Sequence, residues 1–268
     1  MSIITIGFLG AGKMARAIAA GLAKARPGEF SFAATARTPE TLAAFGQSIG
    51  APVSLPKDNA ALVAASDVVV LGIKPGQAAD VLAPLAGSGR LFLSLLAGTT
   101  TAKLEGLLGP NARVVRTMPN VPALIGEGIT GYAPGARATV ADLALVDTLL
   151  SAVGRAVRVE ERDLDAVTAV SGSGPAYVYH FVNALIAGGV AEGLSPEVAR
   201  LLAAQTVIGA GRMVAENPAF SPLDLAAQVK SPNGTTVAAC AVLEERQWEE
   251  ILRAAVAAAR KRAAELSQ

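Results

Sequence analysis

The sequence predicts an α/β domain over residues 1–160, followed by an all-α C-terminal domain over residues 161–268. In the first part, short apolar and β-branched runs alternate with alanine-rich helical stretches. That alternation is typical of a parallel sheet with helices on both faces. From about Glu161 onward the strand pattern disappears, and long helical patterns take its place. A glycine-rich turn near the N-terminus indicates which α/β fold to expect.

That turn follows the apolar run 3–9 and opens onto a stretch with helical character. A strand, a Gly-x-Gly-x-x-Ala turn and a helix form the order that binds a pyrophosphate, because the helix N-terminus faces the anion. Gly10 permits the tight turn, Gly12 lets the backbone approach the phosphates, and Ala15 allows close helix–strand packing. The alternative is a turn without a ligand. We therefore expect a Rossmann-type dinucleotide-binding domain whose phosphate turn comprises Gly10, Ala11, Gly12, Lys13, Met14 and Ala15.

Four more buried strands are expected at 30–34, 67–73, 91–96 and 113–118. In such sheets the ligand crevice lies outside the carboxyl ends of the strands. The turns at these ends supply candidate cofactor contacts: Asn59, Ile73, Lys74, Pro75, Ala97, Gly98 and Asn120. Lys74 is a candidate proton donor or ribose ligand, although a lysine at a strand end is more often a surface residue. Asn120 is expected to bind the cofactor or to shape its loop.

The end of the second strand indicates which dinucleotide binds. A cofactor without a 2′-phosphate is usually held there by an Asp or Glu, but residues 33–38 contain no carboxylate. They carry Arg37 and the hydroxyls of Thr35 and Thr38, which suit a phosphate. We therefore expect NADPH to be preferred, with NADH possible. Alternatively, Arg37 only caps the helix that starts at Thr38-Pro39.

The C-terminal part predicts five helices, at 175–192, 196–216, 223–229, 235–245 and 248–266. The first two are apolar nearly all round, whereas a helix in a bundle normally keeps one polar face. A helical half of this size cannot bury so much apolar surface alone. We therefore expect a homodimer joined through this half, with a self-contained bundle as the alternative.

Composition excludes several other classes. The 268 residues are 52% hydrophobic and 17% charged, and the net charge of +1 comes without a basic tract, which argues against a nucleic-acid partner. Cys240 is the only cysteine, so no intramolecular disulfide can form. We expect no membrane partner, no metal site and a cytoplasmic location, because neither a signal peptide, a membrane-length apolar run nor metal-ligand spacing is found. The single histidine, His180, is expected to pack or to hydrogen-bond at an interface.

Two segments of small and hydroxyl residues, 171–177 and 231–236, lead into predicted helices. Free N–H groups and hydroxyls at a helix N-terminus can hold a small carboxylate. Ordinary helix capping explains the first segment equally well. For the second, which is rich in donors and poor in apolar anchors, we favour substrate binding.

Five motifs together carry a family resemblance: Ile6–Ala15, Gly72–Pro75, Arg116–Asn120, Thr168–Tyr177 and Ser231–Thr236. In this order, over essentially the whole chain, they resemble pyrroline-5-carboxylate reductases. The resemblance implies NAD(P)H-dependent reduction of 1-pyrroline-5-carboxylate to proline, the last step of proline biosynthesis. It also implies a dimer of interlocked helical domains, often assembled into larger rings. One subunit's cofactor domain would then face its partner's helical loop.

Carried over by this resemblance, Ser231, Gly234 and Thr235 would hold the substrate carboxylate, with Asn233 in the same loop. Thr236 would hydrogen-bond at the ring nitrogen and, with Lys74, is the candidate catalytic residue. Asn59, Lys74, Ala97 and Asn120 would line the cofactor cleft. Four positions depart from the family pattern and bear on substrate preference and interface contacts: Asn183 for Glu, Ala226 for a basic residue, Lys230 for a hydroxyl residue and Asn233 for glycine.

Three other functions are considered. In β-hydroxyacid dehydrogenases a lysine follows a Gly-x-Gly turn, but Val178 stands at that lysine position and Val182 lies on the same face. Valine cannot relay a proton. A catalytically silent NADP-binding regulator would bind cofactor without turnover. A reductase of a related cyclic imine would share the mechanism but differ in its substrate.

Overall fold

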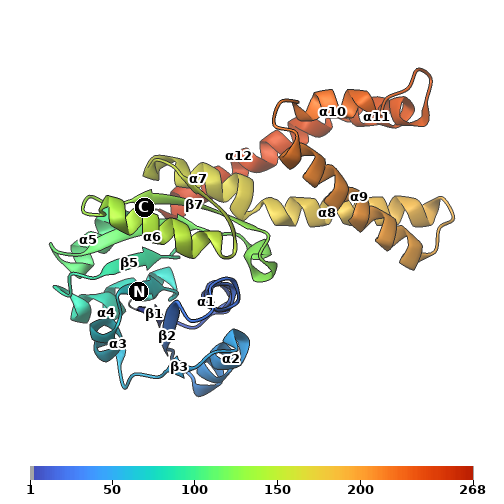
Figure 1. Ribbon diagram of the computed structural model, residues 1–268. Helices are drawn as coiled ribbons and strands as arrows, with labels where there is room; N and C mark the ends of the chain where they lie inside the picture. Colours follow the sequence, from blue (N-terminus) through green and yellow to red (C-terminus); the bar gives the residue numbers. More distant parts are fainter. Residues whose placement is uncertain (1–2, 268) are drawn as a thin grey trace. The chain divides into compact units, whose positions relative to one another are not determined.

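The computed structural model describes residues 3–267, which fold into two compact units (Figure 1). The first, here called the sheet unit, comprises the chain up to Ser173 together with the residues from Ala259 onward. The second, the helical unit, comprises Gly174–Ala258. The last helix, α12 (Trp248–Leu266), therefore begins in the helical unit and ends in the sheet unit. The domain boundary expected after residue 160 stays a prediction.

The sheet unit contains one eight-stranded sheet in the order β3-β2-β1-β4-β5-β6-β7-β8. All five predicted strands are present, and the order reverses between β1 and β4, where a doubly wound sheet binds its ligand. The Rossmann-type fold is thus confirmed. The strands are β1 (Ile4–Leu9), β2 (Phe30–Thr35), β3 (Val53–Ser54), β4 (Val68–Leu71), β5 (Leu91–Ser94), β6 (Arg113–Met118), β7 (Gly128–Pro134) and β8 (Gly154–Arg158).

The five predicted strands pair in parallel, as expected. Three further strands, β3, β7 and β8, were not predicted, and one of them, β7, pairs antiparallel with β6. β3 has only two residues, and β7 contains glycines instead of a β-branched run. These glycines permit close packing: a Cβ on Gly128 would lie 2.8 Å from Ala123, and one on Gly131 would lie 2.7 Å from Val167. The pattern of hydrophobic residues along the sequence cannot predict such close contacts.

Two separate apolar cores cover the two faces of the sheet. Successive strand residues point to opposite faces, so Val68 and Val70 join one core whereas Val69 and Leu71 join the other. The helices of this unit are α1 (Lys13–Ala25), α2 (Pro39–Ile49), α3 (Asn59–Ala65), α4 (Ala78–Leu82), α5 (Thr101–Leu108), α6 (Val140–Ser151) and α7 (Leu164–Val167).

The helical unit has the five predicted helices: α8 (Gly174–Ala191), α9 (Pro196–Glu216), α10 (Pro222–Gln228), α11 (Thr235–Glu245) and α12. No residue of α8 is buried, and α9 buries only Ala199 and Ala203. A self-contained bundle would cover these helices, so that alternative does not describe the unit. Among residues 3–267, α9 is the one helix long and apolar enough to cross a membrane by length and composition. An apolar helix that a second protein chain covers has the same properties.

The segment 171–177, which was expected to lead into a helix, is itself mostly helical: only Ser173 lies outside a helical turn. A π-helical turn, Thr168–Gly172, leads from α7 almost directly into α8. The hydroxyls of Thr168 and Ser171 donate to carbonyls four residues back in their own helix, at 2.8 and 2.9 Å. A Cβ on Gly172 would lie 2.7 Å from the terminal methyl group of the flexible Met118 side chain, which would have to shift to make room.

Candidate functional site

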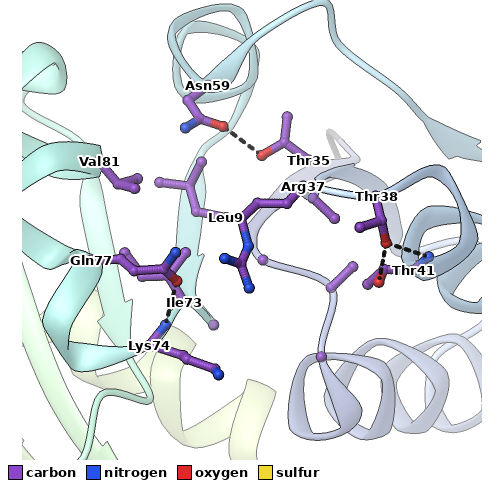
Figure 2. A pocket seen from close by; sticks show the side chains of 15 residues that line it. Leu9, Thr35, Arg37, Thr38, Thr41, Asn59, Ile73, Lys74, Gln77 and Val81 are labelled. Atoms are coloured by element: carbon purple, nitrogen blue, oxygen red, sulfur yellow. Dashed lines mark hydrogen bonds between the residues drawn. The ribbon is translucent and has the colours of Figure 1, made fainter.

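A pocket of about 320 Å³ opens at the carboxyl ends of β1, β2 and β4, where the strand order reverses (Figure 2). Turns that the sequence analysis assigned to the cofactor form its wall. The predicted residues that line it are Gly10, Ala11, Gly12, Thr35, Arg37, Asn59, Ile73 and Lys74. Thr38, whose hydroxyl was expected to suit a phosphate, also lines the pocket. The remaining lining residues, which were not predicted as contacts, are Leu9, Ala36, Thr41, Gly72, Gln77 and Val81.

The floor of the pocket depends on two glycines. Gly10 has φ = +94°, and a Cβ there would lie 2.7 Å from the carbonyl oxygen of Gly72. Gly12 differs, because its φ is −71° and its Cβ would lie 4.0 Å from the nearest atom, the Gly72 oxygen. Gly10 is thus needed by the protein itself, while the space beside Gly12 is open. Ala15 is 1% exposed and packs beneath this turn, as predicted.

The start of α1 is suited to an anion. Its N-cap, Gly12, provides no side-chain oxygen for the free N–H groups, and the first turn holds no acidic residue. Those N–H groups and the helix dipole therefore remain available to a phosphate. The residues present fit the pyrophosphate of a dinucleotide. Lys13, Met14 and Ala15 belong to this turn but do not line the pocket, so cofactor contacts by their side chains stay predictions.

The end of β2 provides the cationic part of the pocket. Figure 2 shows Arg37 projecting over it, with Lys74 and Gln77 on the loop after β4. Neither Arg37 nor Lys74 forms an ion pair within residues 3–267, and no carboxylate is among the lining residues. An unpaired arginine at the end of β2, with no carboxylate among the lining residues, suits a cofactor that carries an additional phosphate.

Hydrogen bonds fix the remaining polar groups of the wall. The Thr35 hydroxyl donates to the Asn59 side-chain oxygen at 2.8 Å, which leaves the Asn59 amide free to donate. Thr38 caps α2 by accepting from the Thr41 N–H at 3.4 Å, so Thr38 and not Arg37 is the cap. The backbone N–H of Lys74 donates to Gln77 at 3.3 Å, whereas the Lys74 side chain stays exposed.

Besides Lys13, Met14 and Ala15, four more predicted cofactor contacts lie outside the pocket lining. Asn120 is 8% exposed and shapes its loop: its amide donates to the Ser171 carbonyl at 3.2 Å and its oxygen accepts from Ile129 N–H at 3.0 Å. Gly98 has φ = +71°, and a Cβ there would overlap the carbonyl oxygen of Leu266 at the end of α12. Cofactor contacts by Pro75, Ala97, Gly98 and Asn120 therefore stay predictions.

The second candidate region is the loop before α11, in the helical unit. Gly234 N–H donates to the Ser231 carbonyl at 2.9 Å, with Pro232 and Asn233 at the corner of the turn. Asn233 has φ = +58°, as position i+2 of a type II turn requires. Asparagine is one of the few residues that tolerate this conformation, so its replacement of glycine preserves the turn. Thr235 and Thr236 begin α11, and the Thr236 hydroxyl has no hydrogen-bond partner within residues 3–267.

The other departures from the family pattern also have a place in the helical unit. Lys230 pairs with Glu244 of α11 at 3.7 Å, so it ties the loop to its helix. Asn183 lines a cavity of about 250 Å³ between α8 and α9, together with Tyr179 and Arg200. Nothing in the structure explains Ala226. Within residues 3–267, no group of three or more His, Cys, Asp or Glu residues could hold a metal ion.

Comparisons with known proteins agree with both halves of this description. Residues 161–266 match the family model for pyrroline-5-carboxylate reductase dimerisation, and residues 5–98 match the model for NADP oxidoreductases that are coenzyme F420-dependent. The pyrroline-5-carboxylate reductase of Pisum sativum is 40% identical over 98% of this chain and 96% of its own length.

Solved structures give the same result. The pyrroline-5-carboxylate reductase of Coxiella burnetii is 36% identical, with a TM-score of 0.91 over 100% of both chains. The Plasmodium falciparum pyrroline carboxylate reductase, determined with NADP bound, is 30% identical, with a TM-score of 0.85 over 100% of both chains. Identity of this degree over the full length of both proteins shows common descent. The chain belongs to the pyrroline-5-carboxylate reductase family.

Proposed function

We propose that this protein reduces 1-pyrroline-5-carboxylate to L-proline with NADPH, with NADH as the poorer donor, as the last step of proline biosynthesis. The observation that carries the proposal is the pocket at the switch point of the sheet, which combines the open anion turn at Gly12 with Arg37 and Lys74. Family membership supports the choice of substrate.

The residues have separate tasks on this proposal. The first turn of α1 binds the pyrophosphate, and Arg37 binds the 2′-phosphate. The loop before α11 holds the substrate, with Ser231, Gly234 and Thr235 at its carboxylate. Thr236 hydrogen-bonds at the ring nitrogen. Lys74 is the second candidate catalytic residue, at the nicotinamide side of the pocket.

When bound, the cofactor supplies a hydride for the C=N carbon of the imine. A cyclic imine protonated at nitrogen is already an electrophile, so the protein does not need a strong acid. Its main task is orientation, which can contribute about 7–11 kcal/mol when two reactants are held close to their reacting geometry. The absence of a paired acid and base among the lining residues is consistent with this chemistry.

The functional unit on this proposal is a homodimer. The exposed apolar residues of α8 and α9, for example Leu201 at 70% and Ile208 at 52%, supply the interface. The match of residues 161–266 to a dimerisation model supports this. One chain's cofactor pocket would then work with its partner's substrate loop. We further propose that the soluble dimers act in the cytoplasm and assemble into a larger ring, which light scattering would test.

The first test is direct. NADPH and NADH oxidation are followed by nicotinamide absorbance with 1-pyrroline-5-carboxylate, and the product is identified by chromatography. Proline formation, faster with NADPH, is the expected result. Tight NADP⁺ binding without turnover would instead indicate a regulator. Turnover only with other cyclic imines would leave the mechanism in place and change the substrate.

A further inference from the structure

The C-terminal end of α12 contacts the loop that follows β5. Gly98, in this loop, approaches Leu266 so closely that a Cβ would lie 2.9 Å from the Leu266 carbonyl carbon and would overlap its oxygen. Gly98 also has φ = +71°, which a residue with a side chain adopts only with strain. Ala263, one turn earlier, is 8% exposed and therefore buried. The C-terminal end of α12 is thus packed against this loop.

A network of polar side chains also links the C-terminal end of α12 to the start of α5. Ser267 Oγ donates to Asp165 Oδ1 at 3.2 Å, and Asp165 faces Arg116 Nη2 at 3.7 Å. Arg116 is only 5% exposed and also pairs with Glu161 at 3.4 Å. The Glu161 carboxylate accepts from the N–H and the hydroxyl of Thr101, at 2.7 and 2.6 Å. Because Thr101 begins α5, directly after the loop, this chain of contacts fixes the far end of the loop.

This loop lies in the half of the sheet that meets the nicotinamide. In a doubly wound sheet, one set of strands on each side of the switch point binds one mononucleotide. The pocket at β1, β2 and β4 includes the adenosine side with Arg37, whereas β5 and β6 continue the sheet on the other side of β4. The loop after β5 therefore borders the nicotinamide side of the same edge. None of the residues that fix it touches the pocket.

We infer that the C-terminal end of α12, chiefly Leu266 and Ser267, positions the loop after β5 for the nicotinamide half of the cofactor. This inference rests on the proposed function. Leu266 acts through Gly98, and Ser267 acts through Asp165 and the buried Arg116. They are positioning residues, since neither meets the cofactor. Misplacement of a reacting group by about 1 Å can lower a rate about a hundredfold, so a small shift of this loop is enough to matter.

The test compares the full chain with a chain that ends at Glu265. Two ligands are titrated into each protein: NADP⁺, and adenosine 2′,5′-bisphosphate, which lacks the nicotinamide half. We expect the truncation to weaken NADP⁺ binding and to lower kcat by about tenfold to a hundredfold, with adenosine bisphosphate affinity unchanged within about twofold. Equal loss of both ligands would mean general damage to the unit and would overturn the inference, as would unchanged NADP⁺ binding and kcat.

Single variants separate the inference from the proposed function. Ser267→Ala should reproduce part of the kcat loss and Ser267→Thr should restore it. Glu265→Gln should behave as wild type, because Glu265 pairs only with the exposed Arg262. Gly98→Ala should be less harmful in the truncated chain, where Leu266 no longer opposes the added methyl. If the effects of Gly98→Ala and of the truncation are additive, Leu266 does not oppose a side chain at position 98. If the full chain binds neither ligand, the proposed function fails before the inference is reached.

Discussion

Gly10 and Gly72 face each other across the floor of the pocket, each in the space that a side chain on the other would need. A Cβ on Gly72 would lie 2.6 Å from the Gly10 carbonyl oxygen, and one on Gly10 would lie 2.7 Å from that of Gly72. The turns after β1 and β4 therefore approach backbone to backbone. This approach closes the floor at the switch point and leaves the space beside Gly12 open.

Alanine at Gly10 should therefore lower stability, whereas alanine at Gly12 should weaken cofactor binding. Gly10→Ala should lower the free energy of unfolding by more than about 1 kcal/mol, because a left-handed conformation with a Cβ is strained and the methyl also meets Gly72. Gly12→Ala should leave stability unchanged but weaken NADPH binding, since its methyl points into the open space. Thermal unfolding and fluorescence titration distinguish the two. A Gly10→Ala protein as stable as the wild type would show that the turns after β1 and β4 can move apart.

Arg37 should determine the preference between the two nicotinamide cofactors. Arg37→Gln removes the charge near the 2′-phosphate and keeps a polar side chain. A charge-assisted hydrogen bond contributes about 1.5–3 kcal/mol, so KM for NADPH should rise about tenfold to a hundredfold. KM for NADH should stay within about twofold, because NADH has no 2′-phosphate. Equal effects on both cofactors would show that Arg37 only stabilises its loop.

Asn233 should be replaceable by glycine but not by alanine. Its φ of +58° lies in the left-handed region, which asparagine and glycine tolerate and alanine adopts at a cost of about 1–2 kcal/mol. Asn233→Ala should therefore distort the Ser231–Gly234 turn and raise KM for the imine, whereas Asn233→Gly should not. KM for NADPH is the internal control, and it should stay constant in both variants. A raised imine KM in the glycine variant as well would show that the amide side chain itself meets the substrate.

Hydrophobic periodicity predicted the five main strands and the five C-terminal helices, because these elements are long or apolar enough to show a period. The pattern could not find β7, whose Gly128 and Gly131 are explained by neighbours that come from elsewhere in the chain. Gly98 illustrates the same limit at the site. It was assigned to the cofactor from its place after a strand, but its closest neighbour is Leu266, which is 168 residues later. Contacts between distant segments leave no local signal.

Tyr132 should make the protein less stable at alkaline pH. Burial, followed by the nearby Asp147 carboxylate, raises its pKa above the usual 10.0, and only Arg158 opposes this. Because the folded pKa exceeds the unfolded one, the contribution to stability is complete below about pH 10 and is lost as pH rises through the folded pKa. Tyr132→Phe should flatten this decline in urea unfolding at about pH 9 to 11. If the stability of Tyr132→Phe falls with pH as steeply as that of the wild type, other groups cause the loss.

Thr236 should affect the chemical step and not cofactor binding. Thr236 is the second residue of α11, two residues after the Ser231–Gly234 turn, and its hydroxyl has no partner within residues 3–267. It is therefore free to hydrogen-bond at the ring nitrogen of the imine. Thr236→Ala should lower kcat/KM for the imine about tenfold to a hundredfold, as the loss of a hydrogen bond to a charged group predicts. KM for NADPH should not change.

Two further variants give this prediction a control. Thr236→Ser keeps the hydroxyl and should retain most of the activity, whereas Thr236→Val keeps the shape and should behave like the alanine variant. Any loss caused by helix packing would appear in the serine variant and not in the valine variant, since serine removes a methyl group and valine does not. Equal activity of the valine variant and the wild type would exclude Thr236 from the reaction and leave Lys74 as the remaining candidate at the ring nitrogen.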